Sequence, residues 1–171
     1  MTGQRPKALV LCLGNSDRGD DGVGPAVAEA LEWRLPAGVE MVTRSGDMLA
    51  LVEDWAGYDT LVCVDAAASL GEPGRIHRID LADEELPPGM AAVSSHAFGL
   101  GEAIALARAL GLAPRHIVVY AVEGENFETG ALMSEQVAAA VAPAAERIAA
   151  ETVFKAVDRD SLPMDSVGNA P

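Results

Sequence analysis

The sequence predicts an α/β protein: a three-layer α/β/α sandwich around a twisted, mostly parallel sheet of five strands with one antiparallel edge strand. Short apolar runs of strand length alternate with segments of helix length along the chain. Strands that are separated by helices are joined by right-handed crossovers, so they run parallel and carry helices on both faces. One pair of consecutive strands is separated by a Gly-Pro turn instead of a helix, and this turn predicts the antiparallel edge.

Five elements are expected in the first part of the chain, and two kinds of signal mark them. Strands are marked by short continuous apolar runs, which are typical of strands buried on both faces. Helices are marked by suitable first turns: Pro25 is tolerated there, and Asp47 can act as an N-cap. The expected elements are strands Ala8–Leu13, Val39–Thr43 and Leu61–Val64, a helix from Gly24 to about Arg34, and a helix from Asp47 to about Trp55.

The second part begins with the turn Gly71–Gly74 and the strand that follows it. Apolar and polar residues alternate in Arg75–Ile79, as in an edge strand with one solvated face, so His77 is expected to be solvated. An acidic, proline-bearing surface loop comes next. The remaining expected elements are a helix Phe98–Leu110, a strand His116–Val122, a solvated loop Glu123–Gly130, and a last helix from Ser134 to about Phe154 that contains Pro143.

Length, charge and cysteine content exclude several classes of protein. The 171 residues suit one domain, which we expect at residues 1–155, with residues 156–171 as a frayed tail. The net charge of −14 argues against binding to nucleic acid or to anionic lipid. No apolar run is long enough to cross a membrane, and the N-terminus does not look like a signal peptide. We therefore expect a cytoplasmic monomer in which Cys12 and Cys63 are buried, reduced thiols.

Chemically reactive side chains gather at one predicted edge of the sheet. Ligands of open parallel sheets bind beyond the carboxyl ends of the strands. Asp20 and Asp21 follow the first strand, Asp65 follows the third, and His96 precedes the third long helix. Singly, the acidic pair can stabilise a helix N-terminus by about 0.3–1 kcal/mol, and His96 can be a surface or capping histidine. Together, two carboxylates and an imidazole suit a divalent metal such as nickel, zinc or iron.

The glycine-rich segment that contains the acidic pair does not match a phosphate-binding loop. It lacks both the Gly-x-Gly-x-x-Gly order and the Lys-Ser/Thr pair of such loops. Asp20 and Asp21 would also repel a phosphate. A receiver-type signalling domain, with a phosphorylatable Asp65, is disfavoured as well, because the acidic pair lies six residues past Gly14 and no lysine follows the last strand.

These motifs, in this order, resemble the [NiFe]-hydrogenase maturation endopeptidases over about residues 8–150. The resemblance is carried by Leu-Cys-Leu-Gly-Asn15, Asp20-Asp21-Gly22-Val23-Gly24, Leu61-Val62-Cys63-Val64-Asp65-Ala66, Ser95-His96-Ala97-Phe98-Gly99-Leu100 and Pro143. It implies an α/β sandwich that removes a short C-terminal extension from the hydrogenase large-subunit precursor after nickel insertion. It further implies that Asp21, Asp65 and His96 contact this nickel, which the substrate supplies.

The sequence departs from the family pattern at two places, and the second bears on which precursor is accepted. Cys12 stands where many members have glycine, and Arg44-Ser45-Gly46-Asp47 replaces an acidic residue followed by glycines. For the chemistry, we hypothesise that Asp20 or Asp21 orients water as a general base while nickel polarises the scissile carbonyl. The alternative is a non-catalytic, nickel-binding maturation chaperone on the same scaffold, which would use the same ligands.

Overall fold

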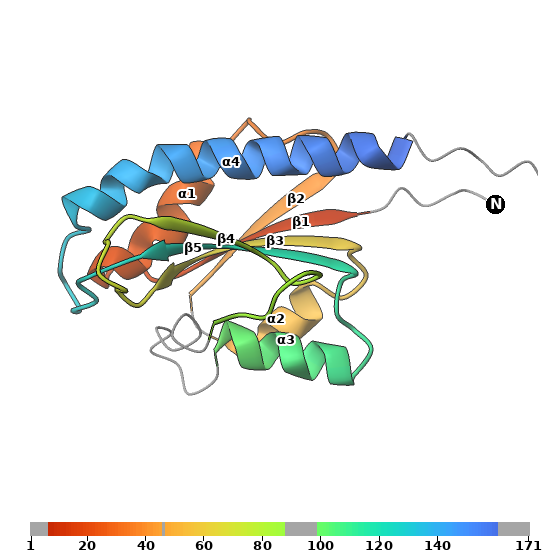
Figure 1. Ribbon diagram of the computed structural model, residues 1–171, viewed down its shortest axis with the longest axis horizontal. Coiled ribbons are helices and arrows are strands. Elements are labelled where there is room, and N and C mark those ends of the chain that lie inside the picture. The colour runs from red at the N-terminus through yellow and green to blue at the C-terminus, as the bar shows by residue number, and fades with distance from the viewer. Residues whose placement is uncertain (1–6, 46, 88–98, 161–171) are drawn as a thin grey trace, which may run out of the picture.

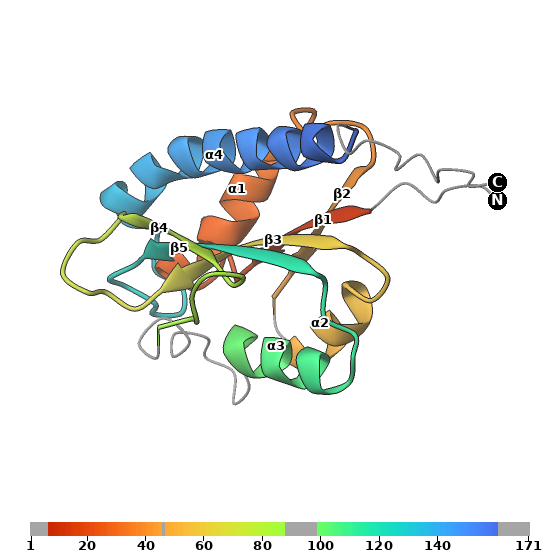
Figure 2. The same cartoon turned by 45° about the vertical axis from the view of Figure 1, so that its right-hand side comes forward.

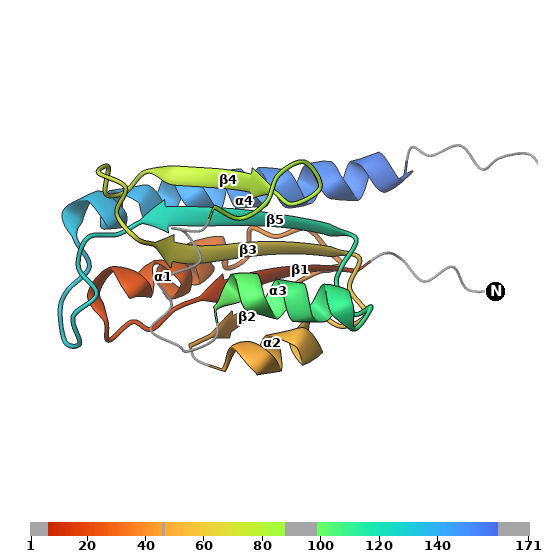
Figure 3. The same ribbon diagram turned by 60° about the horizontal axis from the view of Figure 1, so that its bottom comes forward.

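The computed structural model describes residues 7–45, 47–87 and 99–160, and within them the side chains of all residues but 48 and 155–160. Five strands form one sheet in the order β2-β1-β3-β5-β4. Neighbouring strands are parallel except β4, which pairs antiparallel with β5 at one edge. Figure 3 looks onto this sheet, with β4 at one edge and β2 at the other. The strands are β1 (Ala8–Leu13), β2 (Val39–Arg44), β3 (Thr60–Ala67), β4 (Ile76–Asp80) and β5 (His116–Glu123).

Helices cover both faces of the sheet, so the predicted three-layer sandwich is confirmed. Figures 1 and 2 show α1 and α4 on one face and α2 and α3 on the other. A single 3₁₀ turn, η1, leads directly into α1. The helical elements are η1 (Gly19–Gly22), α1 (Val23–Leu31), α2 (Met48–Asp54), α3 (Leu100–Ala109) and α4 (Glu135–Asp160). Among the described residues, no helix is long and apolar enough to cross a membrane.

Two apolar cores lie on the two faces of the sheet, and alternate residues of β1 contribute to each. Leu9 and Leu11 pack on the side of α2 and α3, while Val10 and Cys12 pack on the side of α1 and α4. This double burial explains why the strand reads as a continuous apolar run. Both cysteines are free and buried, as predicted, and burial raises the pKa of the Cys12 thiol to about 12.

Three elements end three or more residues away from the end that the sequence predicts. Helix α1 stops at Leu31, and Trp33 just beyond it has a left-handed φ of 65°. Strand β3 extends to Ala67 because its partner β5 continues alongside it, so Asp65 lies within the strand instead of after it. Helix α4 runs to Asp160, where a frayed tail was expected from residue 156, because no glycine or proline interrupts it after Pro143. The rest of that predicted tail, 161–171, lies outside the described residues.

Candidate active site

The carboxyl ends of the parallel strands meet at one end of the molecule, and three loops form the rim there. The strands β1, β3 and β5 run toward the left in Figure 1, and α3 begins at the same end. We call the residues that follow these strands the rim loops: 14–22 after β1, 68–74 after β3 and 124–134 after β5. All the candidate residues that the structure describes lie in these loops or at the ends of these strands.

A glycine lets the first rim loop turn back onto the strand end. Gly14 has a φ of 140°, which side-chain-bearing residues rarely adopt, and a Cβ atom there would lie 1.9 Å from the backbone oxygen of Asp21. The loop then winds into η1, on which Asp20 and Asp21 are consecutive. The tight turn therefore places the acidic pair directly beside the end of β1.

Asp21 is a buried carboxylate with few compensating contacts. The residue is 6% exposed, and its Oδ2 accepts a hydrogen bond of 3.0 Å from the backbone N–H of Asn15. The guanidinium Nη1 of Arg18 lies 3.8 Å from the same oxygen, at the limit of an ion pair. A buried carboxylate with so few contacts favours a cation nearby, because desolvation of its charge is costly.

Asp65, on β3, lies close enough to Asp21 to be affected by its charge. Burial and then the negative charge of Asp21 raise the pKa of Asp65 to about 8, against the lowering effect of a hydrogen bond from the Ala66 amide. The raised pKa favours the protonated form of Asp65 while no cation is near. A divalent cation bound between the two carboxylates would displace that proton. The structure thus brings together two of the three predicted metal ligands.

Asp20 differs from its neighbour in what its side chain contacts. Both of its carboxylate oxygens accept backbone N–H groups of the rim loop 124–134: Oδ2 from Glu125 and Asn126, and Oδ1 from Ser134. Burial alone would raise the pKa of Asp20, but these hydrogen bonds outweigh it and hold the pKa below the usual value of an aspartate. With its oxygens engaged in this way, Asp20 is a poorer candidate for a general base than Asp21.

The third predicted ligand, His96, lies outside the described residues. Within the residues that are described, no group of three or more His, Cys, Asp or Glu side chains could hold a metal ion. Asp21 and Asp65 are therefore the members of the predicted metal set to which the structure gives a position.

Two residues that were expected to be solvated are in fact held together at the rim. Glu123 is the last residue of β5 and is 1% exposed, and its Oε1 lies 2.6 Å from Nε2 of His77. Burial would raise the pKa of Glu123, but the contacts with His77 and with the Leu70 and Glu72 amides lower it. The prediction was wrong because β5 continues one residue further than its apolar run and so carries Glu123 into the sheet.

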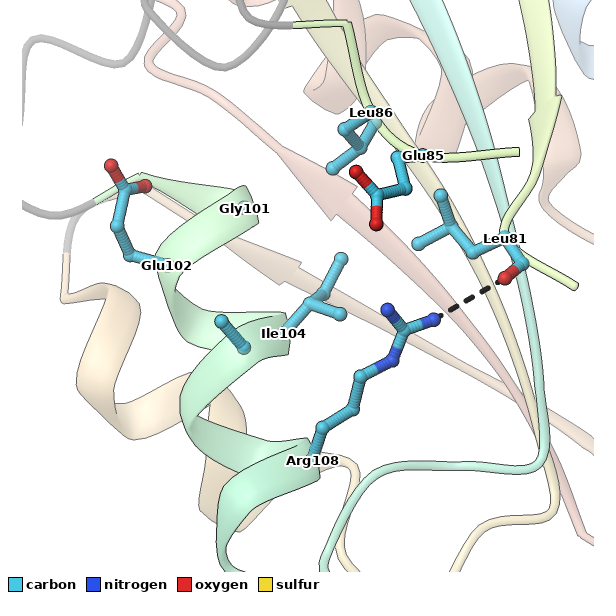
Figure 4. A pocket seen from close by; sticks show the side chains of 8 residues that line it. Leu81, Glu85, Leu86, Gly101, Glu102, Ile104 and Arg108 are labelled. Carbon is cyan, nitrogen blue, oxygen red and sulfur yellow. Dashed lines mark hydrogen bonds between the residues drawn. The ribbon is translucent and has the colours of Figure 1, made fainter.

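A hollow of about 400 Å³ lies between α3 and the segment after β4, and neither Asp21 nor Asp65 lines it. Figure 4 shows Arg108 spanning it, with Nη2 donating a hydrogen bond of 3.3 Å to the carbonyl oxygen of Leu81. Ile104 and Leu86 supply much of its apolar wall. The hollow contains neither Asp21 nor Asp65, so it belongs to the flank of the molecule and not to the candidate site.

The sequence matches a known protein family over most of its length. The family model described as hydrogenase maturation protease, HycI, matches residues 25–151. The chain belongs to the hydrogenase maturation proteases. The matched range includes Asp65 and His96 but begins just after Asp20 and Asp21. The family that the motifs resemble is thereby confirmed, and the family match does not depend on the acidic pair.

Individual members of this protease family show the same relationship. The chain is 31% identical over 146 residues to the hydrogenase expression/formation protein HupD of Thiocapsa roseopersicina, covering 82% of the chain and 65% of HupD. It is 32% identical over 149 residues to HupM of Azotobacter chroococcum mcd 1, covering 84% of the chain and 70% of HupM. The match thus spans about two thirds of these relatives.

A solved structure of a family member has the same fold. The hydrogenase maturating endopeptidase HybD from E. coli superposes with a TM-score of 0.71 at 26% identity, covering 87% of this chain and 93% of HybD. The mostly parallel sheet with its antiparallel edge strand is therefore the α/β architecture of the maturation proteases.

Proposed function

We propose that this chain is an endopeptidase that removes the C-terminal extension of a [NiFe]-hydrogenase large-subunit precursor after nickel insertion. Membership of the maturation protease family supports the peptidase activity and the hydrogenase partner. A cytoplasmic location fits the two buried cysteines, which are free thiols. The nickel is part of the substrate in this proposal, not a permanent metal of the protease.

The proximity of Asp21 and Asp65 is the observation that carries the site assignment. Both are near the carboxyl end of the sheet, on η1 and β3, and the charge of one acts on the other. Oxygen ligands together with an imidazole suit a divalent transition metal that retains open positions. We propose that Asp21, Asp65 and His96 contact the precursor's nickel and so place the scissile peptide beside the rim loops.

Asp21 is the residue that we propose as the general base. It would take a proton from a water molecule whose oxygen attacks the scissile carbonyl carbon, while the bound nickel polarises the carbonyl. The C–N bond then breaks, and the proton passes to the leaving amine. Asp20 is not proposed for this role, because three backbone amides engage its carboxylate.

The test uses purified protein and a nickel-loaded large-subunit precursor, with release of the C-terminal peptide measured by mass spectrometry. We expect Asp21→Asn, Asp65→Asn and His96→Ala each to slow cleavage by about 100-fold or more, as loss of a catalytic or ligand group does. Asp59→Asn is the matched control, since Asp59 lies just before the amino end of the same strand as Asp65. It should cleave at the wild-type rate.

Two outcomes would contradict the proposal in different ways. Wild-type cleavage by Asp21→Asn would remove this residue from the chemistry. Binding of the nickel-loaded precursor by the wild-type protein without any cleavage would instead indicate a non-catalytic maturation chaperone. The wild-type protein should also cleave a nickel-free precursor far more slowly than the nickel-loaded one. Equal rates would contradict recognition of the nickel.

A further inference from the structure

Two buried carboxylates at the rim, Asp20 and Glu123, are not part of the proposed nickel site. They are 0% and 1% exposed, respectively. Asp and Glu are almost never fully buried without partners, because removing a charge from water is expensive. Their partners are mainly backbone amides of two rim loops that lie far from them in the sequence.

Asp20 fastens both ends of the rim loop 124–134 to η1. Its Oδ2 accepts hydrogen bonds of 2.8 and 3.1 Å from the amides of Glu125 and Asn126, near the start of the loop. Its Oδ1 accepts a bond of 2.7 Å from the amide of Ser134, at the end of the loop. A single side chain therefore closes the loop, since it bonds both of its ends.

The backbones of the two loops are also in direct contact. The amide of Gly19 donates to the carbonyl oxygen of Ala131, and the amide of Gly130 donates to that of Asp17. A Cβ atom at Gly124 would lie 2.8 Å from the Cβ of Asp20, so a larger residue there would push the loop away. The loop 124–134 is thus packed tightly against the loop that carries Asp21.

Glu123 does the same for the rim loop 68–74. Its Oε2 accepts hydrogen bonds of 3.0 Å from the amides of both Leu70 and Glu72. Its own carbonyl oxygen accepts a bond of 2.7 Å from the amide of Gly74, and His77 holds the second carboxylate oxygen. The loop after β3, the strand that carries Asp65, is therefore fixed at its middle and at its end.

Each of these ordered loops presents one exposed leucine to solvent. Leu132 is 89% exposed on the loop 124–134, and Leu70 is 61% exposed on the loop 68–74. A loop that is already ordered loses less conformational entropy when a partner binds, so its contacts contribute more to affinity. An apolar side chain on a fixed loop beside the candidate site suits contact with the surface of a folded protein substrate.

We propose that Asp20 and Glu123 are positioning residues that hold the loops 124–134 and 68–74 in the shape that receives the precursor protein, with Leu132 and Leu70 in contact with it. This inference rests on the proposed function, and it names the surface by which the same site recognises its substrate. The carboxylates act through the loops and touch neither nickel nor the scissile peptide.

The first test replaces each carboxylate by its amide, in Asp20→Asn and Glu123→Gln. In each variant an NH₂ group replaces a carboxylate oxygen that accepts backbone N–H groups. Two donors then face each other, so the loop should open locally. We expect faster hydrogen exchange at the amides of 125, 126 and 134 in the first variant and of 70 and 72 in the second. The KM for nickel-loaded precursor should rise about tenfold while kcat changes by less than about twofold.

Glu151→Gln is the matched control for these two variants. Glu151 is a carboxylate on α4, and the side chains of Arg78 on β4 and Tyr120 on β5 are among its partners. Its replacement should lower stability and leave both KM and rim-loop exchange unchanged. If Asp20→Asn and Glu123→Gln behave as Glu151→Gln does, with lowered stability alone, the positioning role is wrong.

The leucines supply a second test that does not depend on folding, because their side chains are exposed. Leu132→Ser and Leu70→Ser should raise KM for the precursor several-fold, and Leu112→Ser should not. Leu112 is 44% exposed in the connection between α3 and β5, at the opposite end of the sheet. If the wild-type protein cleaves normally but KM is unchanged in both Leu132→Ser and Leu70→Ser, the proposed contact of these leucines with the precursor is wrong, while the proposed function stands. A wild-type protein that neither binds nor cleaves the precursor would overturn the proposed function itself.

Discussion

At the residue scale, the position of Asp21 depends on two glycines that leave no space for a side chain. Gly14 makes the turn after β1, and Gly24 lies in the first turn of α1. A Cβ atom at Gly24 would lie 1.9 Å from the carbonyl oxygen of Leu13. The helix therefore packs directly on the strand backbone, and η1 between them has little freedom to move.

The variant Gly24→Ala tests this close contact. Alanine in a helix is normally better than glycine by about 0.5–1 kcal/mol, but overpacking typically costs about 1–3 kcal/mol. We therefore expect a net loss of stability in urea unfolding together with slower precursor cleavage. Gly38→Ala is the control: its φ of 88° also makes alanine unfavourable, but no atom lies within 4 Å of the new Cβ. It should lose stability and keep the wild-type cleavage rate, and equal cleavage by both variants would contradict the role given to Gly24.

At the element scale, one carboxylate joins the edge strand β4 to the long helix α4. Arg78 on β4 donates two hydrogen bonds of 2.8 Å to the two oxygens of Glu151. The hydroxyl of Tyr120 on β5 donates a third to Oε2, also 2.8 Å long. An edge strand has only one neighbour in the sheet, so this link to the helix compensates for the missing second neighbour.

Removing the link with Glu151→Ala should destabilise the protein by about 2–3 kcal/mol, because charge-assisted hydrogen bonds are lost and the buried Tyr120 hydroxyl loses a partner. Urea unfolding gives the measurement. A double-mutant cycle with Arg78→Ala should show coupling of about 1 kcal/mol or more. Strictly additive effects of the two substitutions would mean that the pair contributes nothing to stability.

At the scale of the whole molecule, the net charge of −14 separates into a few buried acids and many solvated ones. Asp20, Asp21 and Glu123 are buried at the rim, and each accepts at least one backbone amide. Most of the remaining acids lie at least partly in solvent, where they favour solubility. Acidic conditions should therefore affect the rim before the apolar cores.

The pH dependence of stability follows from the lowered pKa of Glu123. A group whose pKa is lower in the folded than in the unfolded protein stabilises the fold above its unfolded pKa, and this contribution is lost as the pH falls through the folded pKa. The difference in unfolding free energy between wild type and Glu123→Gln should thus be largest above pH 4.5, the ordinary pKa of a glutamate. It should shrink toward zero as the pH falls further. A difference that stays constant down to pH 2 would contradict this account.

Most of the fold could be predicted because apolar periodicity reports burial directly. The continuous runs of β1 and β5 are buried on both faces, and the alternation of β4 reflects its position at the edge. The ends of elements were less predictable, since they depend on partners. Strand β3 continues through Asp65 only because β5 lies beside it, and no local pattern in β3 indicates this.

The sequence indicates which acidic side chains lie at the rim, but not how they are arranged there. Asp20 and Asp21 are neighbours with the same side chain, and only the course of η1 gives them different partners. The role of Glu123 was missed because its amide partners lie 51 and 53 residues earlier in the chain, beyond any local pattern. The place of His96 remains a prediction from the sequence.

The hydrogen bonds of Asp20 have a consequence for synthesis of the protein. They join residues that are 105 to 114 positions apart. During translation, Asp20 is therefore synthesised long before the loop residues that bond it. Contacts of such sequence separation form late, because the intervening chain must be ordered first. A nascent chain that ends before residue 134 therefore contains Asp20 and Asp21 but lacks the complete loop 124–134. The rim would be complete only once the chain through residue 134 has left the ribosome.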